Sequence, residues 1–405
     1  MRAEPELYGI YKKDENGNEL KDANGNRILD EEGDYSGYFR DIQWKNKAIT
    51  ELYYPGSVFK VITSAMGVDS GLANINTTFT CAGAYGVAKE TYHCAGHKAH
   101  GTITLAEALR QSCNIYYIQL GQRVGSQTFY NYFDAFGFTS RTGVDLPSET
   151  GFMQYYKANQ LGEVQLASSA FGQAMAITPL QMCTAVAAAV NGGYLVTPHV
   201  VDKITDANGN VIEEIGANVR RQVISESTSN VIRQIMEYEV GAGTGGGKYA
   251  YVSGYRIGGK SGTSEQLNMD RRADGDYKKV ASFAAVLPAD DPEIIVYVML
   301  DDPNNARTDY SSCWQRPLWA TSSARSHPTL HCRRRRGSQP DCGHCAESGG
   351  HRVEQCAGAA EHQGPQASAG RKHHQSGGSS CHLPVSARGC KGGLRHHRVP
   401  VYRYL

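Results

Sequence analysis

The stretch Tyr54-Pro55-Gly56-Ser57-Val58-Phe59-Lys60 combines a turn signal with the start of a helical pattern. Pro55-Gly56 favours a turn, because proline fixes φ and glycine adopts backbone conformations that other residues avoid. Residues 57–66 are predicted to form a helix, on which Ser57 and Lys60, three residues apart, share one face. The pair offers a nucleophilic hydroxyl beside a base, although an isolated S-x-x-K is more often a helix cap and a solvated lysine.

Two later stretches complete a pattern with the first. Ser112-Cys113-Asn114 follows an amphipathic segment, and Lys260-Ser261-Gly262-Thr263 follows a short strand-like run that ends in two glycines. The order S-x-x-K, S-x-N and K-S-G-T is the motif set of penicillin-binding proteins and serine β-lactamases. From about Trp44 to about Tyr310, the chain resembles the transpeptidase domain of class B penicillin-binding proteins of the division or sporulation type. The resemblance extends to 44–48 ahead of the first motif and to 100–105 and 177–181 between the motifs, and residues 258–265 around the third motif complete it.

The resemblance implies an α/β fold, the penicillin-binding protein transpeptidase or serine β-lactamase-like fold, in which helices sandwich an antiparallel sheet. The sequence pattern agrees, since it offers three late strand candidates, of which the last is nearly all apolar. They are Tyr255–Lys260, Val280–Leu287 and Ile294–Asp301. The third motif is therefore expected on an edge strand.

Helices and hairpin turns are predicted elsewhere from local signals. A helix pair is expected at 105–120 with a break near the second motif, a buried Ala-rich helix after Thr178-Pro179, and an amphipathic helix at Ser225–Val240. The Asn-Gly pairs at 16–17 and 24–25, and the stretch 206–209, predict hairpin turns.

By resemblance, the reaction is that of a peptidoglycan D,D-transpeptidase, which cross-links stem peptides ending in D-Ala-D-Ala. Ser57 would form the acyl-enzyme, and β-lactam antibiotics would inhibit it covalently. Lys60 would take the proton of Ser57, which requires a pKa lowered by burial and by a nearby cation, Lys260. Ser112 would relay the proton to the leaving amine, and Asn114 would hold the amide of the substrate.

The third motif would supply the remaining contacts. Lys260, Ser261 and Thr263 would bind the terminal carboxylate of the substrate, with Gly262 between them in the same motif. The N–H groups of Ser57 and Thr263 would form the oxyanion hole. No metal or organic cofactor is implied.

Three alternatives to the transpeptidase stay open. A serine β-lactamase needs a base that activates water, and Glu149 and Glu163 lie in the right interval but lack the Leu-Asn context of class A enzymes. A β-lactam sensor needs an attached signalling segment, and none is visible. The third alternative is an inactive truncated fragment.

The bulk composition restricts partners and location. With 41 Lys and Arg against 40 Asp and Glu, the formal charge of +1 gives no support to nucleic-acid binding through net charge. The sequence contains no run of about 18 apolar residues, so it predicts no membrane-spanning segment. The resemblance implies work at the extracytoplasmic face of a bacterial membrane beside a membrane glycosyltransferase, so Met1 is expected to be an internal start or an artificial boundary.

Four cysteines lie in the family-like part, at positions 81, 94, 113 and 183. Cys81, Cys94 and the histidines at 93, 97 and 100 suggest zinc, but their spacing matches no standard structural zinc site, so turn and groove residues are preferred. A disulfide from Cys113 to Cys94 or Cys81 is a redox hypothesis, because it would reshape the second motif. A buried free thiol is the simpler interpretation.

The chain divides into three predicted parts: a polar, turn-rich segment at 1–43, the transpeptidase domain at 44–312 and a tail at 313–405. The tail holds ten of the fourteen histidines and seven of the eleven cysteines, and its apolar periodicity is gone. It could be a disordered basic tail or a zinc-binding tail around Cys342-x-x-Cys345. A reading-frame slip is preferred, because residues 314–324, shifted in frame with one choice of codons, resemble the family's C-terminal helix.

Overall fold

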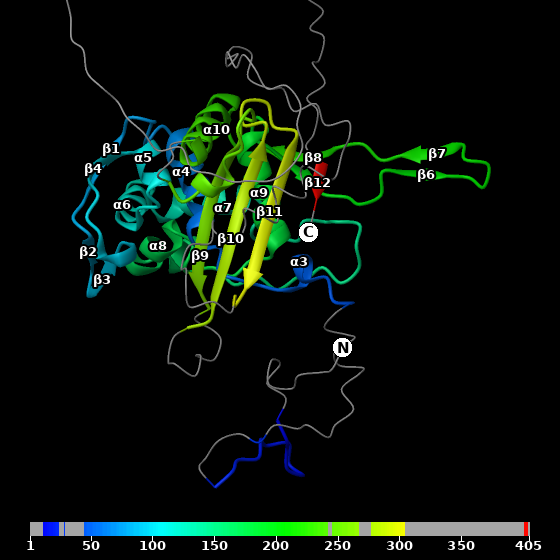
Figure 1. Cartoon of the computed structure of the whole chain (residues 1–405), viewed down its shortest axis with the longest axis horizontal. Helices are drawn as coiled ribbons and strands as arrows, with labels where there is room; N and C mark the ends of the chain where they lie inside the picture. Colours follow the sequence, from blue (N-terminus) through cyan, green and yellow to red (C-terminus); the bar gives the residue numbers. More distant parts are fainter. Residues whose placement is uncertain are drawn as a thin grey trace, which may run out of the picture. The chain divides into compact units, whose positions relative to one another are not determined.

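The central sheet contains the three strands predicted late in the chain. In the computed structural model, β9 (Gly258–Glu265), β10 (Lys279–Leu287) and β11 (Ile294–Asp301) are antiparallel neighbours (Figure 1). The strand β12 (Val401–Arg403) pairs parallel to β11, and the strand order is β12-β11-β10-β9. The third motif thus lies on an edge strand of this sheet, as predicted.

The predicted start of this edge strand was three residues too early. Pairing with β10 begins at Gly258, opposite Val286, and continues to Glu265, opposite Lys279. The whole third motif is therefore held in regular extended backbone by β10.

The structure describes residues 11–23, 28, 44–241, 245–266 and 277–303, and the backbone alone of 401–403. All of these residues belong to one compact unit, Met1–Arg335 with Arg398–Leu405. The predicted turn at Asn24-Gly25 and the predicted nature of the tail lie outside the described residues, apart from the backbone of β12.

The remaining described elements precede the sheet in the chain. The helices and 3-10 turns are α3 (Lys47–Thr50), η1 (Gly56–Phe59), α4 (Lys60–Asp69), η2 (Ala95–His97), α5 (Leu105–Arg110), α6 (Asn114–Val124), α7 (Ser126–Ala135), η3 (Ala158–Gln160), α8 (Glu163–Ala170), α9 (Pro179–Val190), α10 (Glu226–Gly241) and η4 (Lys248–Ala250). The short strands are β1 (Thr78–Cys81), β2 (Ala84–Val87), β3 (Glu90–His93), β4 (Gly101–Thr104), β5 (Tyr194–Thr197), β6 (Lys203–Thr205), β7 (Val211–Glu214) and β8 (Asn218–Gln222). None of the described helices is long and apolar enough to cross a membrane.

The sheet buries both of its faces, as the alternation along β10 shows. Val280, Ala284 and Val286 belong to the main hydrophobic core, whereas Phe283 and Leu287 belong to a second cluster. Helices α9 and α10 pack against β11 and β9. Since successive side chains of a strand point to opposite faces, one near-continuous apolar strand supplies both cores.

The Ala-rich helix α9 forms the centre of the main core, and every one of its residues is buried. Its start was predicted correctly, because Thr178 caps the helix and Pro179 occupies its first turn. The Thr178 side chain accepts a hydrogen bond from the Gln181 N–H at 3.1 Å, and the Gln181 side chain accepts one from the Thr178 N–H at 3.0 Å. Alanine side chains leave room for neighbouring elements to approach closely.

Two predicted hairpin turns are confirmed by the structure. Asp206 accepts hydrogen bonds from the N–H groups of Asn208 and Asn210, both at 2.8 Å, between β6 and β7. The N–H of Gly17 donates to the carbonyl of Asp14 at 3.0 Å, and Gly17 has a φ of +85°.

The helix predicted from Ser57 differs from the observed one. Residues Gly56–Phe59 form the 3-10 turn η1, and the α-helix α4 begins only at Lys60. Gly56 has a φ of +55°, so the chain enters the turn through a left-handed residue. Ser57 therefore lies in the tight turn and Lys60 at the start of the helix.

Close backbone contact holds this turn in place. The Gly56 N–H donates to the Gly172 carbonyl at 2.9 Å, and a Cβ on Gly172 would lie 2.2 Å from the Gly56 oxygen. On the other side, a Cβ on Gly56 would lie 2.7 Å from the carbonyl oxygen of Thr263 on β9. Only glycine fits at these two positions, and the first and third motifs meet there through their backbones.

Replacing Gly172 with alanine is expected to destabilise the domain by about 2–5 kcal/mol. About 1–2 kcal/mol comes from a side chain at positive φ, and about 1–3 kcal/mol comes from overpacking against Gly56. Denaturant unfolding of Gly172→Ala measures the loss. Gly71→Ala is the matched control, because Gly71 also has a positive φ of +71° but has nothing within 4 Å of its Cβ position. Equal losses in the two variants would contradict the packing argument.

Candidate active site

The amine of Lys60 is the centre of the site, and the side chain is completely buried. Its Nζ donates to the Ser112 carbonyl at 2.7 Å and to the Asn114 Oδ1 at 2.7 Å, and it lies 3.2 Å from the Ser112 Oγ. The first motif, in η1 and at the start of α4, is thereby joined through one side chain to the second motif, which leads into α6.

Local structure places the second motif for this contact. Helix α5 ends at Arg110, and α6 begins at Asn114 with Cys113 as its N-cap, so a sharp break separates the helices, as predicted. Ser112 has a φ of +51°, which is rare for a residue with a side chain. The Asn114 Nδ2 donates to the His93 carbonyl at 2.9 Å, which leaves its Oδ1 directed at Lys60.

The surroundings of Lys60 favour its neutral form. Burial, and secondly the charge of Lys260, lower the pKa of Lys60 from its ordinary value of 10.5 to about 7. This is the direction and the cause that the sequence predicted. A substantial fraction of Lys60 is then neutral near physiological pH.

Lys260 has a partner that sequence reasoning missed. Lys260 and Glu239 are both completely buried, and their side chains form an ion pair at 3.4 Å. Burial lowers the pKa of Lys260, and Glu239 opposes that shift. Burial also raises the pKa of Glu239, and Lys260 opposes that shift. The sequence does contain a signal, because Glu239 follows Ile232, Ile235 and Met236 on the apolar face of α10, where an acidic residue needs a partner.

The other residues of the third motif alternate along β9. Ser261 and Thr263 are half-buried on one face, whereas Lys260 and Gly262 are buried on the other. Lys260 Nζ also donates to the Ser261 carbonyl at 3.0 Å. A Cβ on Gly262 would lie 2.8 Å from the side chain of Val58, so the strand passes directly over η1.

Ser57 is half-buried in η1, between Lys60 and the strand that carries the third motif. The structure therefore brings the five residues predicted as catalytic into one region.

The cysteines predicted as redox partners are also close to this region. The sulfur atoms of Cys94 and Cys113 lie 3.6 Å apart, and those of Cys81 and Cys94 lie 3.5 Å apart. All three are free thiols in this structure. The disulfide stays a prediction.

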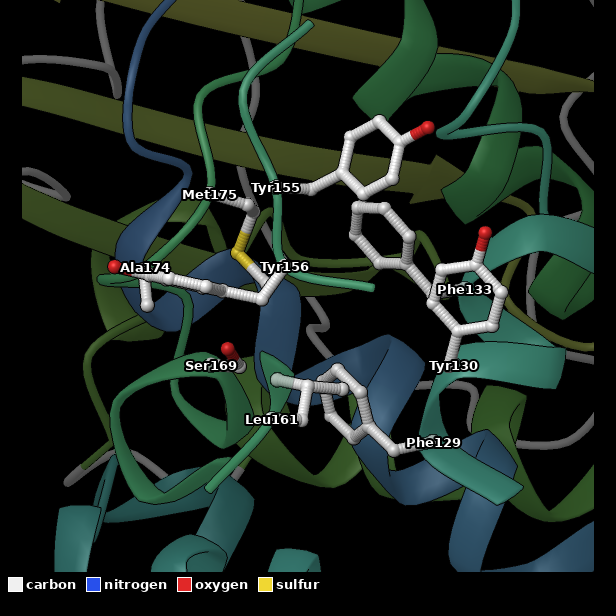
Figure 2. A pocket seen from close by; sticks show the side chains of 9 residues that line it. All are labelled: Phe129, Tyr130, Phe133, Tyr155, Tyr156, Leu161, Ser169, Ala174 and Met175. Carbon is white, nitrogen blue, oxygen red and sulfur yellow. The ribbon is translucent and has the colours of Figure 1, made fainter. Parts of the chain in front are cut away.

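An aromatic pocket lies elsewhere in the domain (Figure 2). Rings from α7 and from Tyr155 and Tyr156 line this pocket. No residue of the three motifs lines this pocket, so it has no part in the proposed chemistry.

Comparison with known proteins identifies the family of the chain. The family model described as penicillin binding protein transpeptidase domain matches residues 10–315. Stage V sporulation protein D from Bacillus subtilis is 36% identical over 273 residues, which are 67% of this chain and 41% of that protein. Probable peptidoglycan D,D-transpeptidase FtsI from Caulobacter vibrioides is 33% identical over 273 residues, 66% of this chain and 44% of that protein.

A solved structure gives the same fold. Penicillin binding protein 3 from Mycobacterium tuberculosis, complexed with ampicillin, superposes with a TM-score of 0.62 at 26% identity, over 74% of this chain and 67% of that chain. The chain spans less than half the length of the curated relatives it matches. On the match to residues 10–315, which exceeds half of its length, this chain belongs to the penicillin-binding protein transpeptidase domain family.

Proposed function

We propose that this chain acts as a peptidoglycan D,D-transpeptidase, which cross-links stem peptides through an acyl-enzyme on Ser57. The observation that carries the proposal is the buried Lys60 amine, which lies three residues after Ser57 and contacts both Ser112 and Asn114. A neutral amine in that position is a general base beside a hydroxyl nucleophile.

The hydrogen bonds of Lys60 suit it to receive a proton. A neutral amine has two N–H donors, and two acceptors lie at 2.7 Å, namely the Ser112 carbonyl and the Asn114 Oδ1. The lone pair is then free to accept a proton from a serine hydroxyl. In the proposed first step, Ser57 Oγ attacks the carbonyl carbon of the D-Ala-D-Ala bond while its proton passes to Lys60.

The proton then leaves through the second motif. Ser112 Oγ lies 3.2 Å from Lys60 Nζ, so it can relay the proton to the nitrogen of the departing D-alanine. The C–N bond breaks and an ester to Ser57 remains. The amine of a second stem peptide attacks this ester, which forms the cross-link and returns the hydroxyl to Ser57.

The third motif binds the substrate in this scheme. Lys260, with the half-buried Ser261 and Thr263, would hold the terminal carboxylate, and the Ser57 and Thr263 N–H groups would stabilise the oxyanion. β-Lactams would occupy the same place and acylate Ser57.

A β-lactamase is the closest alternative, and the geometry disfavours it. The Glu149 carboxylate accepts hydrogen bonds from the Thr142 N–H at 2.7 Å and the Gly143 N–H at 3.0 Å, so it is committed to its own loop. Glu163 is exposed in the first turn of α8. Neither is placed to activate water at Ser57.

The site of action follows from the substrate. Stem peptides lie outside the cytoplasmic membrane, so we place the activity at the extracytoplasmic face of a bacterial membrane. A membrane glycosyltransferase that makes the glycan strands is the proposed partner.

Ser57→Ala is expected to abolish covalent labelling by a fluorescent penicillin. The wild-type chain should gain the mass of one penicillin, and the adduct should persist because neither Glu149 nor Glu163 serves as a base for its hydrolysis. Intact-mass spectrometry after brief exposure measures both. Ser126→Ala is the control, since the Ser126 Oγ donates to the Leu161 carbonyl at 2.6 Å, away from the motifs.

Other outcomes would count against the proposal. Consumption of the drug without an adduct indicates a β-lactamase, and an unconsumed drug indicates an inactive fragment.

The acylation rate is expected to rise with pH through a midpoint of about 7, the pKa of Lys60. Below the midpoint Lys60 is protonated and cannot accept the serine proton, and above it the rate should level off. Stopped-flow labelling across pH 5.5–9, a range of about two pH units around the midpoint, measures this. A rate that keeps rising towards 10.5, the ordinary lysine value, would contradict the role of Lys60.

Lys260→Met is expected to slow acylation by about 100-fold and to move the pH midpoint upward. The substitution removes a contact to the substrate carboxylate and also the cation that lowers the pKa of Lys60. The same pH profile provides the measurement. Lys248→Met is the control, because Lys248 is exposed in η4. A slower reaction with an unmoved midpoint would show that Lys260 does not act on Lys60.

A further inference from the structure

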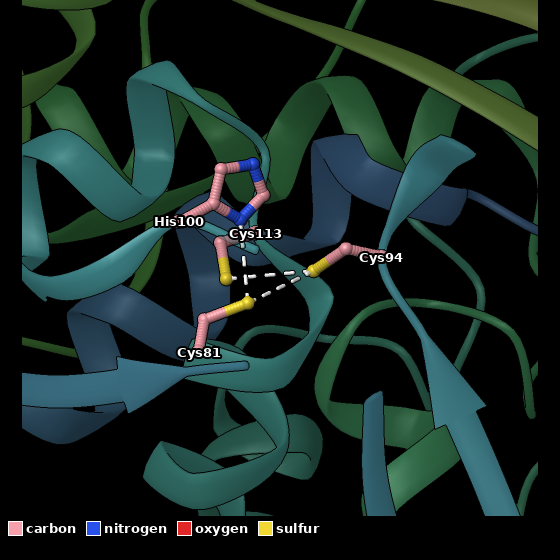
Figure 3. A group of neighbouring side chains, drawn as sticks. All are labelled: Cys81, Cys94, His100 and Cys113. Carbon is pink, nitrogen blue, oxygen red and sulfur yellow. Dashed lines mark hydrogen bonds between the residues drawn. The ribbon is translucent and has the colours of Figure 1, made fainter. Parts of the chain in front are cut away.

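Three thiols and one imidazole converge beside the second motif (Figure 3). Cys81 ends β1, Cys94 follows β3, His100 precedes β4 and Cys113 caps α6. The four ligand atoms lie within 4.8 Å of one another. The three cysteines are almost completely buried, with exposed fractions of 1%, 3% and 0%. Four chain segments thus deliver four metal-ligating atoms to one point.

Three of the six distances between the ligand atoms are close to those around a tetrahedral zinc ion. Zinc–sulfur bonds of about 2.3 Å at tetrahedral angles place ligand sulfurs about 3.8 Å apart, and a sulfur and a nitrogen ligand slightly closer. The Cys81–Cys94 and Cys94–Cys113 sulfurs are 3.5 and 3.6 Å apart, and the Cys81 sulfur lies 3.4 Å from the His100 Nδ1. A disulfide would require about 2.05 Å. We propose that Cys81, Cys94, His100 and Cys113 bind one Zn²⁺ as a closed, structural Cys₃His site.

Backbone N–H groups are directed at two of the sulfurs. The Tyr116 N–H donates to the Cys113 sulfur at 3.4 Å, and the Ile115 N–H hydrogen bonds to the Cys94 sulfur. Both donors belong to the first turn of α6, an eleven-residue helix. N–H groups that orient thiolate ligands are the usual surroundings of a bound metal. Zn²⁺ would replace the protons of three thiols and offset two of their three negative charges in the core.

The composition of the site favours zinc among the metals. Thiolates select soft metals, and a closed set of three thiolates and one imidazole leaves no open position for catalysis. The ion would therefore act as a cross-link rather than as a reagent.

Sequence spacing concealed this set. Cys94, His97 and His100 suggest a compact motif, but His97 packs against His93, with ring centroids 4.2 Å apart, and is not part of the set. The fourth ligand is Cys113, which lies in the second motif. Only the return of the chain through β4 and α5 brings it to the other three.

The proposed ion would stabilise the second motif. It ties the excursion at 82–100 to the N-terminus of α6, where Ser112 has its strained φ of +51°. The same excursion contacts Asn114 through the His93 carbonyl at 2.9 Å. A consequence for acylation rests on the proposed function, whereas metal binding itself does not.

Zinc content measures the proposal directly. The full chain, purified with a reductant, is expected to carry zinc at this site, and Cys81→Ala, Cys94→Ala and His100→Ala should each lose about one equivalent by elemental analysis. Cys183→Ala is the matched control, because Cys183 is a buried free thiol in α9 outside the set. A Cys342→Ala/Cys345→Ala double variant should retain this equivalent, which separates it from metal bound by the tail.

Cobalt substitution avoids dependence on variant folding. The wild-type chain, stripped by a chelator and loaded with Co²⁺, should show thiolate-to-cobalt charge transfer and the visible bands of a tetrahedral ion. Zn²⁺ should then displace the Co²⁺ and raise the melting temperature. Ser57→Ala should give the same spectra, so failure of the proposed function would leave this result intact.

Two outcomes would overturn the metal site. One is a reduced chain that takes up neither Zn²⁺ nor Co²⁺ at this position. The other is peptide mapping that finds a disulfide between Cys94 and Cys113 or Cys81 in a chain that binds no metal after reduction.

Discussion

A lysine amine removed from water is the constraint on which the site depends. An ammonium group without solvent is costly unless it is paired or loses its proton, and Lys60 meets this condition through acceptors from the second motif and a lowered pKa. Helix α4 must therefore lie against the break between α5 and α6. The second buried lysine, Lys260, is instead stabilised by an ion pair with the carboxylate of Glu239.

Backbone contact supplies the remaining geometry. Gly56 lies between the carbonyl of Thr263 and the backbone of Gly172, and any side chain there would separate the turn from the sheet. The third motif is thus positioned by strand pairing on one side and by glycine packing on the other. The side chains of Ser57 and Thr263 are half-buried beside this backbone contact.

The cysteine set meets the rest of the site at the second motif. Ser112 has a left-handed backbone, and its neighbour Cys113 is drawn into the set with Cys81 and Cys94. The redox hypothesis and the zinc proposal concern the same sulfurs. They differ in whether two sulfurs form a bond or three surround an ion, and the sulfur–sulfur distances of 3.5 and 3.6 Å favour the ion.

Local sequence determined much of this protein. The order of the three motifs, the start of α9 at Pro179 and the turn at Asp206 follow from signals within a few residues, so they were readable without a structure. The tertiary structure decided the rest. Contacts between segments far apart in the chain determine the 3-10 turn at Ser57 and the pairing of Glu239 with Lys260. Such contacts also bring Cys113 close to Cys81. Tertiary packing determines such contacts, because a buried polar group costs free energy unless a distant segment supplies its hydrogen-bond partner.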